Sequence, residues 1–256
     1  DYVEKTLCRG KRKFSTSFRS DFDYIASGRK RGKLMDGSTG KGSPNGEESG
    51  FWHALAKSGD FPPELFADVD LLSLRNADGE TVAHVLVENG TIPSEELTFH
   101  YLRLKTPDGW SVAHSSVLHG ADACLTLLDE GELVETLALS SNSGDVVGLM
   151  LGEKRLRALA DAGRLYPSVL RVSDDLGRSV AHSCARFGVN FASRLDEGEL
   201  AEILALKDTF GRTVALVCAG HPACKLALKM DEKTLLSADR RGETPAHRLA
   251  RHGNLP

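Results

Sequence analysis

Five histidines recur at the same place in a short motif, and histidine is a common general base and metal ligand. They are His53, His84, His114, His182 and His247. Their regular spacing argues against both roles, because one histidine per layer of packed helices leaves neighbours roughly 10 Å apart, too far to share a metal ion. A neutral imidazole has one donor and one acceptor, so we expect each ring to bind backbone groups of its own loop and of the next.

The string Cys218-Ala-Gly-His221-Pro-Ala-Cys224 is the other metal-like sequence. Its spacing matches no standard zinc site and a fourth ligand is not evident, so we predict no metal ion. The five cysteines, at positions 8, 124, 184, 218 and 224, form no Cys-x-x-Cys pair. This pattern indicates free thiols in a reducing compartment, and we expect a cytoplasmic protein.

Patterns typical of hydrolases and nucleotide-binding enzymes are missing from the sequence. It contains no Gly-x-Ser-x-Gly, P-loop or His-Glu-x-x-His motif. Gly37–Gly46 lacks the strand-to-helix context of a phosphate-binding loop, so we interpret it as a flexible linker. The acidic pairs Asp129/Glu130 and Asp196/Glu197 fall in a duplicated segment and are interpreted as a solvated helix face. We therefore predict that the chain is not an enzyme and needs no cofactor.

Most of the histidines belong to a repeated motif, Gly-x-Ser/Thr-Val-Ala-His. Its glycines are spaced by 30, 35, 33, 34 and 31 residues. A period of 30–35 residues indicates a repeat protein. In such a protein each unit is one supersecondary element that buries its apolar face against its neighbours. The copies begin at Gly79, Gly109, Gly144, Gly177, Gly211 and Gly242, and Phe51–Gly59 is a further, upstream copy.

The best-preserved copy predicts the structure of one unit. Asn76–Gly79 is a turn sequence in which glycine supplies a positive φ angle. Thr81 is placed to cap a short helix, and Gly90 is placed to end it. Pro93 then opens a second helix, whose apolar side reaches Leu102. Each unit is therefore expected to be a helix, a tight turn, a second helix and a loop.

This pattern resembles the Asp-x-x-Gly-x-Thr-Pro-Leu-His motif of ankyrin repeats. The nearest copy, Gly242–His247 followed by Gly253, departs only in having Ala246 for leucine, whereas most copies have Val-Ala in place of Pro-Leu. Leu149 and Leu216 replace the histidine in two units, where we expect the regular stack to deviate. The resemblance covers about residues 50–256 and implies an all-α, ankyrin-like helix-turn-helix repeat solenoid of about six to seven units. It also implies that the histidines are structural.

The amino-acid composition fits a structure of many small stacked layers better than one with a single large core. The chain of 256 residues is 6% aromatic and contains 25 glycines. It has no run of 18 apolar residues and does not open on a signal-peptide pattern, so we expect no contact with a membrane. We divide it into a basic, Ser/Gly-rich and partly flexible segment, 1–49, and a repeat array, 50–256. The units lie near 50–75, 76–105, 106–140, 141–173, 174–207, 208–238 and 239–256, the last being incomplete.

The resemblance implies a concave binding face, lined by the turn tips and the exposed ends of the first helices. In this sequence those positions carry arginines with apolar and aromatic residues between them. Arginine binds carboxylates with two hydrogen bonds, and aromatic side chains supply apolar anchors. We therefore predict a scaffold that binds an acidic segment of another protein. The predicted contact residues are Trp110, Leu118, His119, Arg178, Arg186, Phe187, Phe210, Arg212, Arg240, Arg241 and Arg251.

There are two alternatives, and the first comes from the N-terminal segment. Residues 1–50 contain 11 Lys/Arg and 7 Asp/Glu, net +4, whereas the remainder contains 21 and 29, net −8. The basic clusters Arg9–Lys13 and Arg29–Lys33 could contact nucleic acid, although a solvated tail explains them as well. The repeats could also be the targeting region of a larger effector enzyme. No small-molecule substrate is evident in the sequence.

Overall fold

The structure, a computed structural model, describes residues 44–221, 226 and 229–252. The basic clusters within residues 9–33, on which the nucleic-acid alternative rests, lie outside these residues, as do Cys8, Cys224 and Gly253. The described part is all-α: its extended backbone is limited to isolated β-bridges within the turns. The predicted linker is wrong at its end, because Pro44–Gly46 belong to a helix.

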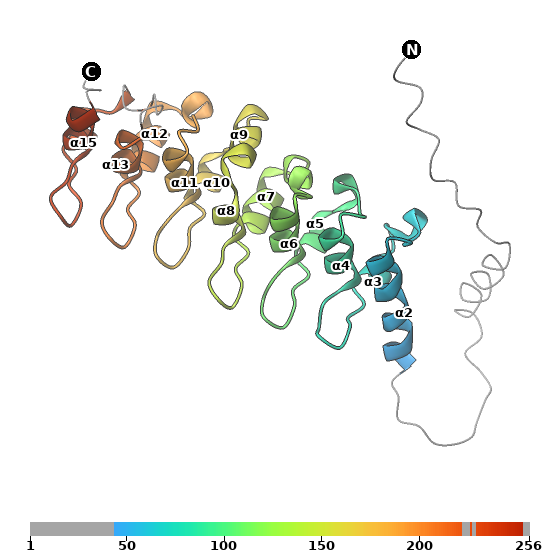
Figure 1. Cartoon of the computed structure of the whole chain (residues 1–256). Coiled ribbons are helices and arrows are strands. Elements are labelled where there is room, and N and C mark those ends of the chain that lie inside the picture. The colour runs from blue at the N-terminus through green and yellow to red at the C-terminus, as the bar shows by residue number, and fades with distance from the viewer. Residues whose placement is uncertain (1–43, 222–225, 227–228, 253–256) are drawn as a thin grey trace, which may run out of the picture. The chain divides into compact units, whose positions relative to one another are not determined.

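The α-helices lie in two rows (Figure 1). The first row contains α2 (Pro44–Ser58), α4 (Val82–Glu88), α6 (Val112–His119), α8 (Val147–Met150), α11 (Val180–Arg186), α13 (Val214–Ala219) and α15 (Pro245–His252). The second row contains α3 (Val69–Leu72), α5 (Phe99–Leu102), α7 (Glu130–Leu137), α10 (Pro167–Arg171), α12 (Glu197–Ala205) and α14 (Glu232–Leu235), and α9 (Glu153–Asp161) lies between α8 and α10. Each first-row helix contacts the next one in its row.

The core lies between the two rows. One leucine at the end of each second-row helix from α3 to α10 is fully buried, and its counterpart near the end of α12 is 1% exposed. Apolar groups of the first row, such as Val82 and Leu86, are buried opposite them. Burial of apolar area is the main favourable term in folding, and here each layer supplies one such set of side chains. The repeated leucines are Leu72, Leu102, Leu137, Leu170 and Leu204.

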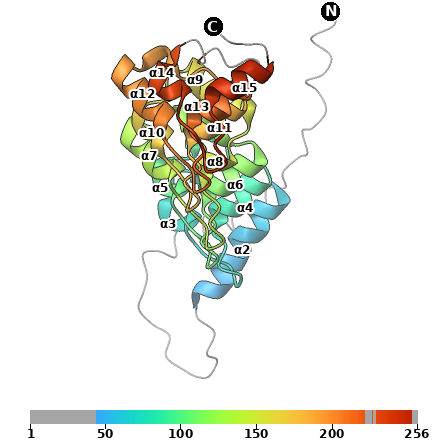
Figure 2. The same cartoon turned by 90° about the vertical axis from the view of Figure 1, so that its left-hand side faces the viewer.

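In the described part of the chain, six turns of the same kind precede first-row helices. In the turn at Asn76, the Asn76 N–H donates to the carbonyl oxygen of Glu80 at 2.9 Å, and the Gly79 N–H donates to the carbonyl oxygen of Asn76 at 3.0 Å. Gly79 has φ +81°, and a Cβ on it would overlap the ring of Pro107 in the next turn. The same two backbone hydrogen bonds recur in the turns that begin at Thr106, Ser141, Asp174, Asp208 and Asp239. Figure 1 shows the turns side by side, projecting from the helices, and Figure 2, which looks along the array, shows that they all project in the same direction.

The predicted cap at Thr81 is confirmed. Its hydroxyl accepts from the His84 N–H at the start of α4, and the Thr81 N–H donates to His84 Nδ1. Gly90, with φ +63°, follows the C-cap residue Asn89 and ends this helix as predicted. Ser111 and Ser179 make the same reciprocal hydrogen bonds with the histidines of their own units. The Ser/Thr-Val-Ala-His sequence therefore begins each of these helices through local hydrogen bonds.

The predicted second helix from Pro93 is wrong in detail. The chain instead forms a 3₁₀ turn at Ser94–Glu96 and then the separate helix α5. Leu97 and Leu102 are both buried, yet residues five apart lie about 140° apart around a continuous α-helix. The break after Leu97 lets both side chains reach the core.

The deviation expected at the units without histidine is found in one of the two. In the first, α8 is a single turn without a side-chain cap, and α9 takes the place of the 3₁₀ turn seen in the neighbouring units. In the second, the prediction is wrong for the first helix: Thr213 caps α13, and Leu216 is fully buried. Leucine fits there because the cap needs only the Thr213 hydroxyl and the Leu216 N–H. Residues 222–225 and 227–228 of this unit lie outside the described residues.

Candidate functional site

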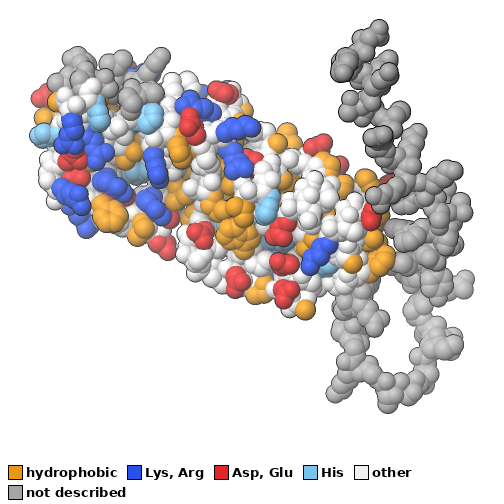
Figure 3. Space-filling view, in the orientation of Figure 1, with side chains coloured by type: hydrophobic (Ala, Val, Ile, Leu, Met, Phe, Trp, Pro, Cys, Tyr) orange, Lys and Arg blue, Asp and Glu red, His pale blue; other side chains and the backbone are white. Residues whose placement is uncertain are grey.

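Four consecutive units enclose a hollow of about 460 Å³ between the turns and the first-row helices. We call it the groove. Its lining carries both arginines and carboxylates, together with a few small or apolar side chains. The residues are Gly144, Asp145, Val146, Leu149, Met150, Asp174, Arg178, His182, Ser183, Arg186, Asp208, Arg212, Val217 and Arg248. Figure 3 shows Lys and Arg side chains gathered over the C-terminal units on this face.

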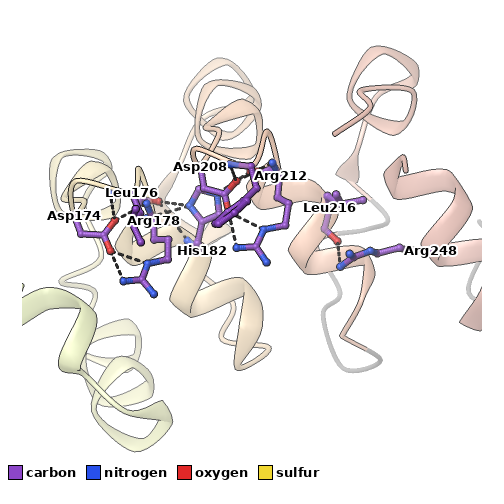
Figure 4. Close-up of polar contacts among 10 residues, drawn as sticks. Asp174, Leu176, Arg178, His182, Asp208, Arg212, Leu216 and Arg248 are labelled. Atoms are coloured by element: carbon purple, nitrogen blue, oxygen red, sulfur yellow. Dashed lines mark hydrogen bonds and ion pairs between the residues drawn. The ribbon is translucent and has the colours of Figure 1, made fainter. Parts of the chain in front are cut away.

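Two neighbouring turns present an arginine in the same way (Figure 4). Asp174 Oδ1 accepts from the N–H groups of Leu176 and Arg178, and its Oδ2 accepts from Arg178 Nε at 2.7 Å. Asp208 binds the Phe210 N–H, the Arg212 N–H and, again at 2.7 Å, Arg212 Nε. One carboxylate therefore fixes both the turn and the direction of the arginine four residues later.

The two ion pairs combine a buried acid with an exposed base. The Asp174 and Asp208 side chains are 4% and 1% exposed, whereas those of Arg178 and Arg212 are 54% and 42% exposed. Burial opposes ionisation of Asp208, but the hydrogen bonds from the Arg212 side chain and backbone outweigh it, and the pKa of this carboxyl is lowered. Each guanidinium group is thus held in one orientation while part of it stays open to a ligand.

Arg248 and Arg186 complete the set of arginines in the groove. Arg248 donates to Glu243 Oε2 at 2.9 Å and to the carbonyl oxygen of Leu216, in the preceding unit, at 3.3 Å. Arg186 is exposed at the end of α11, with its guanidinium carbon 5.8 Å from the centre of the Phe187 ring. Within the described part of the chain, Arg186 forms no ion pair with a carboxylate. Unlike the other three arginines of the groove, it therefore keeps a positive charge that no carboxylate of the described residues compensates.

His182 lies buried in the wall of the groove and joins two units. Its Nδ1 accepts from the Ser179 N–H, so Nε2 carries the proton and donates to the carbonyl oxygen of Arg212 at 3.2 Å. Burial lowers its pKa, which keeps the ring neutral. A neutral ring with both nitrogens engaged is unsuited to act as a general base.

Three other histidines make equivalent bridges, which confirms that they satisfy backbone groups. His53, His84 and His114 place Nε2 at 3.0, 3.3 and 2.9 Å from carbonyl oxygens of the next turn. His247 shares the Nδ1 contacts with Thr244 but is exposed. Within residues 44–221 and 229–252, no three His, Cys, Asp or Glu side chains are grouped as a metal site would require.

The structure brings three of the predicted contact residues, Arg178, Arg186 and Arg212, together in the groove. The others lie around it or farther along the array. Trp110 is half-buried, with Nε1 donating to Ser115, and Arg251 pairs with Glu243. Leu118, His119, Phe210, Arg240 and Arg241 are exposed, and Phe187 is half-buried.

Sequence reasoning missed Arg248 and the carboxylates of the groove. Arg248 directly follows His247, at the position that Ser183 and Val217 occupy in the two preceding units, and both of those also line the groove. The Asp-x-x-x-Arg spacing of 174/178 and 208/212 was a usable signal for the two ion pairs. The acids Asp129 and Asp196, interpreted as part of a solvated face, are exposed, and they also cap α7 and α12 through hydrogen bonds with Glu132 and Glu199.

Charge divides the array along its length. Residues 51–145 contain 4 Lys/Arg and 16 Asp/Glu, net −12, whereas residues 146–256 contain 17 and 13, net +4. The turn tips follow this division: Asp78 and Asp108 occupy the position before glycine in two early turns, and Arg241 occupies it in the last. The groove therefore begins where the array changes from acidic to basic, and nearly all of its lining belongs to the basic part.

None of the helices in the described residues combines the length and the apolar character needed to cross a bilayer. A scan against protein-family models finds no matching family, and a search of curated proteins finds no relative.

Proposed function

We propose that this chain is an ankyrin-like repeat solenoid that acts as a non-enzymatic protein-interaction module, with the groove binding an acidic segment of a partner protein. Support comes from the two rows of helices and the six equivalent turns. The observation that carries the proposed ligand is the set of four arginines that line one hollow. A guanidinium group matches a carboxylate in shape and can bind it with two hydrogen bonds.

The internal ion pairs are compatible with this proposal. Asp174 and Asp208 occupy the Nε edge of their arginines and leave about half of each side chain exposed. A side chain already held in place loses less conformational entropy when a ligand binds. The pairing also reduces net charge, so we expect affinity to depend on how the ligand's carboxylates are placed as well as on their number.

The test uses a fluorescent poly-glutamate peptide and measures its binding by fluorescence anisotropy. We choose Arg186→Glu, because Arg212→Glu would set a second carboxylate beside the buried Asp208 and disturb the turn. Arg194→Glu is the matched control: Arg194 is exposed, forms no ion pair among the described residues and lies outside the groove. Both variants change the net charge equally.

We expect the peptide to bind the wild type and to bind Arg186→Glu about tenfold more weakly, the loss of one charge-assisted contact. Arg194→Glu should bind within about twofold of the wild type, as expected for a distant exposed charge. Equal weakening in both variants would mean that the net charge binds the peptide and the groove does not. Absence of binding to the wild type would contradict an acidic ligand.

A further inference from the structure

Arg178 and Arg212 occupy equivalent positions in successive units, 34 residues apart. Their turns are joined by a hydrogen bond from the Thr209 N–H to the carbonyl oxygen of Leu176 at 2.8 Å. Arg248 follows in the next unit, and Figure 4 shows the three side chains in a row. These three guanidinium groups come from three successive units, Arg178 and Arg212 from turns and Arg248 from helix α15, and each is fixed by a carboxylate of its own unit. Arg186, in the same unit as Arg178, is the fourth arginine of the groove.

The distance between units selects the form of the ligand. Neighbouring first-row helices contact one another, and packed helices lie roughly 8–10 Å apart. A polyproline II segment has three residues per turn and rises about 9.3 Å per turn, so every third side chain points the same way at nearly this spacing. A β-strand repeats its side-chain direction about every 6.7 Å, which does not match one unit.

The rest of the lining agrees with such a ligand. Ser183 and Val217 occupy equivalent positions in neighbouring units, each directly after the first-row position held by His182 and Leu216. Both are small and half-buried, so they leave room for the two residues between successive acidic side chains. Because polyproline II backbone makes no internal hydrogen bonds, its carbonyl groups also remain available to the exposed edges of the arginines.

We propose that the groove binds a polyproline II segment with an acidic side chain at every third residue, in register with Arg178, Arg212 and Arg248. This inference rests on the proposed function, since it specifies the acidic ligand of the same groove. It commits to an extended peptide of a partner protein. An acidic α-helix with carboxylates seven residues apart, which repeats about every 10.5 Å, is the outcome that competes with it.

The test compares three peptides of one composition, and a fourth helical peptide, on the wild-type chain by fluorescence anisotropy. The first is four repeats of Glu-Pro-Pro, the second places the same four glutamates at every second position, and the third places them together at one end. A fourth, alanine-rich helical peptide carries glutamates seven residues apart. We expect the first peptide to bind about tenfold more tightly than the second and third, because several charge-assisted hydrogen bonds form together.

A second measurement assigns the register. Arg212→Gln removes the middle guanidinium, so it should weaken binding of the spaced Glu-Pro-Pro peptide more than binding of the clustered one, while Arg194→Gln should change neither affinity.

Equal affinity for the first three peptides, or preference for the helical one, would overturn the polyproline II inference and leave an acidic ligand in place. Failure of all four peptides and of poly-glutamate would overturn the proposed function itself. The peptide comparison needs no variant, so it remains decisive even if Arg212→Gln unfolds, which its circular dichroism melting curve would reveal.

Discussion

At the scale of single residues, one polar group often fixes two parts of the structure. Asp208 holds its turn through two backbone N–H groups and orients Arg212 with its other oxygen. His84 caps its own helix through Nδ1 and reaches the next turn through Nε2. Removing either side chain would therefore leave buried polar groups without partners in more than one place. In both cases one side chain makes the two contacts through different atoms.

The neutral state of His84 makes stability depend on pH. Burial lowers its pKa from 6.5 to about 4, so between these values the unfolded chain binds the proton more readily. The stabilisation is complete above about pH 6.5 and is lost as the pH falls towards 4. From His84 alone, we expect the free energy of unfolding to decrease by about 2 kcal/mol between pH 7.5 and pH 5. Urea unfolding followed by circular dichroism at the two pH values measures this change.

Two variants separate His84 from the general effect of acid. His84→Gln should be less stable at pH 7.5 and should lose less stability on acidification than the wild type does. His119→Gln, at an exposed position, should retain the full loss. His114 and His182, whose pKa values are also lowered chiefly by burial, will contribute in the same direction in every variant. An unchanged pH dependence in His84→Gln would contradict the assignment.

The buried thiols give a second prediction at this scale. Burial raises the pKa of Cys124 and of Cys184 to about 12, so at pH 8 only roughly one thiol in 10⁴ is ionised. We expect iodoacetamide to leave both unmodified in the folded chain and to modify both in urea. Peptide mass spectrometry of the two samples would read out each site. Rapid modification of Cys184 without denaturant would show that α11 opens readily.

At the scale of elements, sequence predicts what is decided locally. The turns, the caps at Thr81 and Ser111, and the glycine after α4 follow from residues within one short window. The break between Ser94–Glu96 and α5 does not, because it depends on which leucines the second row buries. Arg248 was missed for a similar reason, since its place in the groove depends on its contact with Leu216 in another unit. Contacts between units are the information that a single repeat lacks.

Helix α8 tests this distinction. Gly148 occupies the position that alanine holds in the other five copies of the motif, and alanine favours helix by about 1 kcal/mol. A Cβ at Gly148, however, would lie 2.9 Å from Val180 Cγ2 in α11 and 3.2 Å from the carbonyl oxygen of Leu137. Overpacking costs about 1–3 kcal/mol, so we expect Gly148→Ala to be destabilising by about 1 kcal/mol.

Gly131→Ala is the matched control for this substitution. Gly131 is exposed in α7, and a Cβ there would meet only Asp129 Oδ1, at 3.4 Å. We expect it to stabilise the chain by about 0.5 kcal/mol through the lower entropy of the unfolded state. Chemical denaturation of the two variants gives both signs in one experiment. A stabilised Gly148→Ala would mean that α8 and α11 pack less closely than described.

At the scale of the whole array, the net charge changes sign along the chain, so the two ends of the array differ electrostatically. The acidic residues 51–145, net −12, precede the groove along the chain, whereas nearly all of the lining of the groove belongs to the basic residues 146–256, net +4. Exposed charges act over roughly 10 Å at 0.1 M salt, about one unit of the array. A linear ligand in the groove would therefore meet a different potential at each of its ends. Its orientation should be set by its own charge distribution as well as by the row of arginines.

The orientation of the bound peptide can be tested with two derivatives of the Glu-Pro-Pro peptide. One carries three lysines before the acidic repeats, and the other carries them after. If the acidic part binds Arg178 and Arg212, only one derivative places its lysines over the acidic turn tips Asp78 and Asp108. We expect that derivative to bind several-fold more tightly at low salt and the difference to disappear near 0.5 M salt, where charges are screened within about 4 Å.

The double variant Asp78→Lys/Asp108→Lys should remove or invert the preference. The charge-matched variant Asp60→Lys/Asp70→Lys, at exposed positions away from these turns, should retain it. Equal binding of the two derivatives would mean that the acidic half takes no part in orienting the ligand.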